Sequence, residues 1–72
     1  MEKDKIKDLL LGAGVSNLKE YGYAEVTKEN ILTDNIYSRF FKSALNENKG
    51  SQNSNSQIDG VIDELIMQID KK

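Results

Sequence analysis

Residues 34–48 read DNIYSRFFKSALNEN, and this stretch carries the clearest helical pattern of the chain. Its apolar side chains recur at spacings of three and four and cover about half of a helical wheel. They are Ile36, Tyr37, Phe40, Phe41, Ala44 and Leu45. Thr33 or Asp34 supplies an N-cap, and Gly50 lies just past the expected end. Because both phenylalanines lie on this arc, we expect a helix over residues 34–48 to anchor the core.

Two further helices are expected, one on each side of this stretch. We expect the first over residues 4–20, where an apolar stripe fills one quadrant of the wheel. That stripe consists of Ile6, Leu9, Leu10 and Ala13. We expect the other over residues 57–70, which keep the helical spacing to their end. Its apolar residues are Ile58, Val61, Ile62, Leu65, Ile66 and Ile69.

Glycine and polar residues separate these helices. Gly22 is a natural stop for the first helix, and Thr27 is typical of an N-cap for a short turn over residues 28–32. Residues 46–57 contain no apolar side chain, which predicts a flexible polar linker. The sequence therefore predicts an all-α fold in one domain, residues 1–72. It is a small three-helix bundle with a short extra helical turn and a flexible linker before the last helix.

The composition excludes several classes of function. The 72 residues include no Cys and no His. A disulfide scaffold, an ordinary zinc site and a Ser-His-Asp or Cys-His catalytic arrangement are therefore excluded. Asp59 and Asp63 share one helical face, where a solvated acidic surface is a better interpretation than acid–base catalysis. We expect a protein that is not an enzyme and that needs no cofactor or metal ion.

The apolar runs and the N-terminal residues bear on location. No apolar run approaches the roughly 20 residues that a membrane span needs. The charged residues 1–5, MEKDK, are unlike the start of a signal peptide. A chain without cysteine suits a reducing compartment. We therefore expect a cytoplasmic protein with no membrane partner.

A second apolar stripe on the first helix indicates a protein partner. Leu11, Val15 and Leu18 lie away from the first stripe, and Tyr21 and Tyr23 follow them closely. Unless the tyrosine segment folds over this stripe, it has no neighbour within the chain. A domain this small often gains stability from oligomerisation. We expect these five residues to form the interface of a homodimer or with another protein, and exchange of the last helix between copies stays open.

Two glycines interrupt the first helix. Gly12 and Gly14 each cost about 1 kcal/mol relative to Ala in a helix interior. They permit close approach of another helix or they mark a kink, and the sequence leaves both interpretations open. A dinucleotide-binding loop is disfavoured, because the third glycine and the preceding strand are missing.

A polar stripe on the second helix suggests an alternative function. It consists of Asn35, Arg39, Lys42, Asn46 and Lys49, at spacings of four, three, four and three. Arg, Lys and Asn are side chains that contact bases and phosphates, so the alternative is a small nucleic-acid-binding regulator. The formal net charge of −2 argues against it, because such proteins usually carry a basic surplus. A solvated helix face is the simpler interpretation.

Two short motifs lie in the central segment, residues 26–43. They are ENILTD at residues 29–34 and FFKS at residues 40–43. With these motifs the segment, about a quarter of the chain, resembles small proteins of unknown function encoded by tailed phages of marine bacteria. The resemblance implies a viral or metagenomic origin and a role inside an infected cell, binding and redirecting a host or viral protein. It implies no catalytic or ligand-binding residues.

Overall fold

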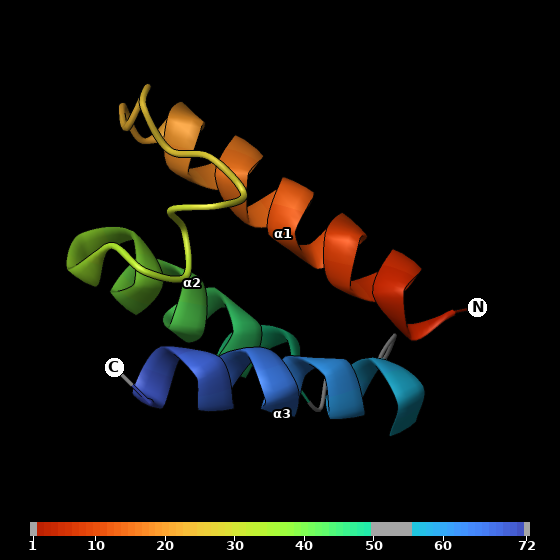
Figure 1. Cartoon of the computed structure of the whole chain (residues 1–72). Helices are drawn as coiled ribbons and strands as arrows, with labels where there is room; N and C mark the ends of the chain where they lie inside the picture. The colour runs from red at the N-terminus through yellow and green to blue at the C-terminus, as the bar shows by residue number, and fades with distance from the viewer. Residues whose placement is uncertain (1, 50–55, 72) are drawn as a thin grey trace.

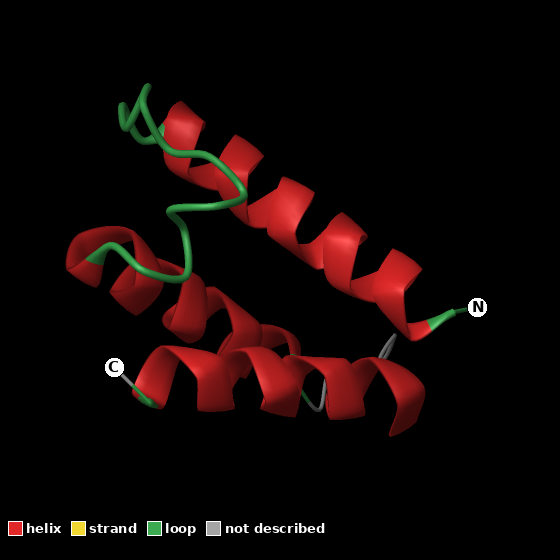
Figure 2. Cartoon of the chain, viewed as in Figure 1, coloured by secondary structure: helices red, strands yellow, loops and turns green. Residues whose placement is uncertain are grey.

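The computed structural model describes residues 2–49 and 56–71, and these form three helices. The helices are α1 (Lys3–Glu20), α2 (Asn35–Asn48) and α3 (Ser56–Asp70). Figures 1 and 2 show them packed together as a bundle, with no strand in the described part of the chain. Each helix begins and ends within one residue of its expected bound. The predicted all-α three-helix fold is confirmed.

The end of α1 and the start of α2 have the capping chemistry that the sequence predicts. Gly22 adopts φ 103°, a left-handed conformation that favours glycine. The N–H of Gly22 donates to the carbonyl of Lys19, and the N–H of Tyr23 donates to the carbonyl of Leu18. This pair of bonds is the Schellman motif. At α2, the Asp34 carboxylate accepts the N–H groups of residues 36 and 37 at 2.8 and 3.0 Å.

The connection between α1 and α2 forms part of the core. The Thr27 N–H donates to Oδ1 of Asn30, and the Asn30 N–H donates to Oγ1 of Thr27. These reciprocal bonds hold a turn over residues 28–33, which confirms the short turn expected at 28–32. Val26, which comes just before this turn, and Ile31, which lies within it, are almost completely buried. The connection therefore supplies apolar side chains that the helices alone do not provide.

The linker expected over residues 46–57 is shorter than predicted. Residues 46–48 form the last turn of α2, and residues 56 and 57 open α3. Polar side chains continue a helix readily once its inner face is anchored, and Leu45 provides that anchor with an exposed fraction of 1%. The N–H of Lys49 then donates to the carbonyl of Leu45 at 3.0 Å. The rest of the predicted linker, residues 50–55, lies outside the described residues.

The core lies where the three helices meet, and α3 contributes most of it. Val61, Ile62 and Leu65 of α3 are almost completely buried and pack with Leu45 and Phe41 of α2. Burying one such side chain stabilises a fold by about 1.5–3 kcal/mol. α3 packs extensively against both other helices, whereas α1 and α2 contact each other less. The contact between α1 and α2 is therefore the smallest of the three helix–helix contacts.

Gly14 is a point of close approach across the seam between α1 and α2. A Cβ at Gly14 would lie 2.6 Å from Cδ1 of Phe41 and 2.9 Å from Cδ1 of Ile31, closer than packed atoms allow. A Cβ at Gly12 would meet only the Lys28 side chain, at 3.5 Å. α1 runs as one helix through both positions. Gly14 thus permits close packing, while Gly12 faces open space beside a flexible side chain.

Candidate interaction surface

A cleft of about 280 Å³, called here the α1–α2 groove, lies along the seam between α1 and α2. Its floor consists of Gly14 and Leu18 of α1 and Phe41 of α2, all of them buried. Phe41 enters the seam because Gly14 has no side chain. One turn further along α2, the small side chain of Ala44 leaves the space open. The groove therefore follows from the order of large and small residues on the two facing helices.

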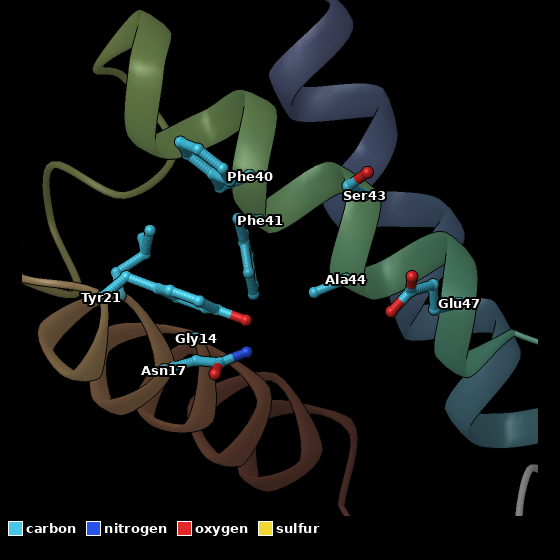
Figure 3. A pocket seen from close by; sticks show the side chains of 9 residues that line it. Gly14, Asn17, Tyr21, Phe40, Phe41, Ser43, Ala44 and Glu47 are labelled. Carbon is cyan, nitrogen blue, oxygen red and sulfur yellow. The ribbon is translucent and has the colours of Figure 1, made fainter.

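Two exposed aromatic rings stand at the rim of the groove. Tyr21, at the end of α1, is 76% exposed, and Phe40 of α2 is 49% exposed. Figure 3 shows the Tyr21 side chain reaching along α1 beneath Phe40 and Phe41, which come from α2. An exposed apolar patch beside a cleft is typical of a protein interaction site. The rim is therefore the part of this surface best suited to a protein contact.

Further aromatic rings support the rim from behind. The ring of Tyr23 lies 5.7 Å from that of Phe40, in a tilted arrangement. It lies 5.7 Å from that of Tyr37 as well, in an edge-to-face arrangement. Aromatic pairs at such distances stabilise each other by about 0.5–1.5 kcal/mol beyond the area they bury. Tyr23 and Tyr37 thus hold Phe40 at the surface instead of letting it move freely.

The wall residues of the groove are mostly uncharged. Asn17 lines it on α1, and Ser43 and Glu47 line it on α2 beside the aromatic rings. Glu47 is the one charged residue among those that line the groove. The groove therefore combines an apolar floor, an aromatic rim and a single carboxylate.

The sequence-predicted interface is only partly at the surface. Leu18 is 3% exposed and belongs to the core, and Leu11 and Val15 are half-buried and pack against it. The prediction that this stripe lacks an intrachain neighbour is wrong. Tyr21 stays at the surface, and Tyr23 is half-buried in its ring contacts.

The connection after α1 explains this correction. Its Lys28 forms an ion pair with Asp8 of α1 at 3.0 Å, and its Ile31 reaches Gly14. The chain thus returns over the side of α1 that carries the second stripe. The stripe is therefore covered within the chain by residues that follow the tyrosine segment, Lys28 and Ile31, while Tyr21 stays exposed. Tyr21 and Leu18 are the two predicted residues that the structure brings together in the groove.

Sequence reasoning missed the exposed role of Phe40. Both Phe40 and Ile36 lie on the arc that was expected to anchor the core, yet they are 49% and 57% exposed. The buried centre of α2 lies instead at Ser38, Phe41 and Leu45. One signal was present: an apolar arc covering half of the wheel is wider than one helix face buries. The residues at the outer edge of this arc, Ile36 and Phe40, are the ones that a single buried face leaves exposed.

The predicted nucleic-acid stripe is divided by ion pairs to α3. Lys42 Nζ lies 2.6 Å from Asp70 Oδ1, and Lys49 Nζ lies 2.6 Å from Asp63 Oδ1. The hydrogen bond and the charge of Asp63 raise the pKa of the Lys49 ammonium. These two lysines therefore face carboxylates of their own chain. The remaining members of the stripe, Asn35, Arg39 and Asn46, are exposed on α2.

The acidic residues of α3 serve the fold in the same way. A third pair joins Glu64 of α3 to Lys3 of α1 at 2.7 Å. All these pairs are exposed, so water and salt screen them and each contributes little to stability. They lie at the margins of the two seams that α3 forms.

Among residues 2–49 and 56–71, no group of three or more acidic, His or Cys side chains is placed to hold a metal ion. None of the helices in the described part of the chain has the length and apolar character of a membrane span. In comparisons with known proteins, no family model, curated protein or solved structure matches the chain.

Proposed function

We propose that this chain is a non-enzymatic helical interaction module that self-associates through the α1–α2 groove and its aromatic rim. The observation that carries the proposal is the pair of exposed rings, Tyr21 and Phe40, at the edge of an apolar cleft. Tyr and other aromatic residues are enriched among the side chains that dominate binding energy. An apolar floor continuous with the core gives such an anchor a rigid surface to meet.

A second copy of the chain is the proposed occupant. The chain is short and carries no disulfide, so association is the remaining common source of additional stability for a domain of this size. A standard interface buries about 800 Å² on each partner. The total surface of the chain is 5049 Å², and its extents are 31 × 25 × 20 Å. One broad face of the molecule is therefore large enough.

The cellular setting forms part of the same proposal. The resemblance of residues 26–43 to small phage proteins supports a binding role without catalysis, in the cytoplasm of an infected cell. The groove fits this role because it is open and contains one carboxylate instead of an enclosed set of polar groups.

Sedimentation velocity over a concentration series tests the proposal. We expect the sedimentation coefficient of the wild-type chain to rise with concentration, because dimers form. Phe40→Ser removes a rim ring and should keep the chain monomeric. Met67→Ser is the matched control, because Met67 is 58% exposed on α3, away from the groove. A wild-type chain that stays monomeric at high micromolar concentration contradicts the proposal, and so does equal behaviour of the two variants.

A further inference from the structure

One exposed row of residues on α2, beside the groove, has a small residue at its centre. A positive charge lies on one side of this residue and a negative charge at the same distance on the other side. Arg39, Ser43 and Glu47 follow one another at intervals of four residues, and all three are exposed. Residues at this interval form one row along a helix surface. About 12 Å of helix rise separates Arg39 from Glu47. Neither residue takes part in the ion pairs found within the described residues.

This row is complementary to itself when it is reversed. If two copies of α2 lie antiparallel and cross at Ser43, Arg39 of each copy faces Glu47 of the other. A two-fold interface repeats every contact, so both charges of both copies are paired. The crossing point also suits close approach, because Ser43 and its neighbour Ala44 are small.

We infer that two copies of this chain associate through antiparallel α2 helices that cross at Ser43, with Arg39 of each copy paired with Glu47 of the other. This inference rests on the proposed function, since it names the partner and the register at the same groove. Phe40 lies three residues from the crossing, about 4.5 Å along the helix. In this register each Phe40 ring meets the end of the other copy's groove that Ala44 and Glu47 line.

Charge reversal at the two positions tests the register. Arg39→Glu places two carboxylates in each contact, and Glu47→Arg places two guanidinium groups there. We expect each variant alone to dimerise about tenfold more weakly than the wild-type chain. An equimolar mixture of the two variants restores opposite charges at both contacts. The mixture should therefore form heterodimers with close to wild-type affinity.

Lys5→Glu is the control for net charge. It changes the charge of the chain by the same amount as Arg39→Glu. Lys5 is exposed and lies on the side of α1 away from Tyr21, about 160° around the helix. We expect Lys5→Glu to dimerise within about twofold of the wild-type chain, because exposed charges beyond a Debye length of about 8 Å are largely screened.

A cysteine variant tests the crossing point directly. The natural chain has no Cys, so any disulfide in a single-cysteine variant joins two copies. Disulfides form between residues whose Cα atoms lie about 4.4–6.8 Å apart. We expect Ser43→Cys to oxidise quickly to a covalent dimer that keeps the wild-type helical signal. Ser16→Cys, at an exposed position on α1 outside the groove, should oxidise slowly.

The outcomes separate this inference from the proposed function. If Phe40→Ser abolishes dimerisation but Arg39→Glu behaves like Lys5→Glu, the groove is the interface and the inferred register is wrong. If the mixture of Arg39→Glu and Glu47→Arg forms no heterodimers, the register is wrong as well. If the wild-type chain never dimerises, both proposals fail. Restored dimerisation in the mixture, together with rapid cross-linking through Ser43→Cys, supports the register.

Discussion

The seams that α3 forms and the seam between α1 and α2 are completed in different ways. Each α3 seam has buried aliphatic side chains at its centre and ion pairs at its margin, such as Lys42 with Asp70 and Lys3 with Glu64. At the α1–α2 seam Phe41 packs closely on Gly14, and the seam then opens into a groove. The α1–α3 seam has a cleft as well, of about 440 Å³, but mostly charged and polar side chains line it, whereas exposed aromatic rings border the α1–α2 groove. This contrast is the basis for assigning stability to α3 and binding to the α1–α2 seam.

The largest expected effect comes from a change at the centre of the α3 seams. Leu65 is 0% exposed, so Leu65→Ala leaves a cavity within the bundle. We expect the free energy of unfolding to fall by about 2–5 kcal/mol, enough to unfold much of a marginally stable domain. Urea denaturation followed by circular dichroism measures this loss. If Leu65→Ala lowers the free energy of unfolding by no more than a substitution at an exposed position does, the contrast between the seams is contradicted.

The next effect concerns the close contact between Gly14 and Phe41 in the α1–α2 seam. Gly14→Ala places a methyl group against Phe41 and Ile31 and should lower the free energy of unfolding by about 1–3 kcal/mol. Gly12→Ala is the matched control in the same helix. Its methyl group has room, so the better helix propensity should raise stability by up to about 1 kcal/mol. If urea denaturation shows that both variants lose stability, or that both gain it, the close approach at Gly14 is contradicted.

The smallest expected effect is the pH dependence of one marginal ion pair. The hydrogen bond to Asp63 and the charge of Asp63 raise the pKa of Lys49 in the folded chain above its ordinary value of 10.5. The pair therefore stabilises the fold fully below pH 10.5, and this contribution is lost as the pH rises through the folded pKa. We expect wild-type stability to decline more steeply above pH 10.5 than that of Lys49→Met.

Urea denaturation at neutral and alkaline pH measures that difference in slope. Lys5→Met serves as the control, because it removes a lysine that has no ion pair within the described residues. If Lys49→Met and Lys5→Met show the same alkaline slope, the Lys49–Asp63 pair does not contribute to stability.

Local sequence patterns predict most of this fold. The apolar spacing and the capping residues, Asp34 and Gly22 among them, determine where helices begin and end, and those signals depend on near neighbours. The candidate site depends on contacts between distant segments. That Lys28 and Ile31 return over α1, and that Gly14 admits Phe41, follow from packing that no local pattern contains. Of the residues in the predicted interface, Tyr21 therefore lies at the surface, whereas Leu18 belongs to the core.

The exposure of Phe40 shows the same limit from the other direction. An apolar arc indicates which residues favour burial, but how many are buried depends on the side chains of the other helices that can pack against them. On α2 the core accepts Phe41 and Leu45, and the outer edge of the arc remains at the surface. Local sequence patterns do not predict the ion pairs of α3 either. Asp63 and Asp70 lie far along the chain from their partners, Lys49 and Lys42.

The most direct test of the account is a map of backbone amide chemical shifts by nuclear magnetic resonance as the concentration is raised. If copies of the chain meet at the groove, the amide signals of its residues should shift together along one binding curve, while signals on α3 away from the groove stay fixed. The groove residues are Tyr21, Phe40, Ser43 and Glu47, and the reference residues on α3 are Met67 and Gln68. Shifts confined to α3, or none up to millimolar concentration, would contradict the claim that copies of this chain meet at the α1–α2 groove.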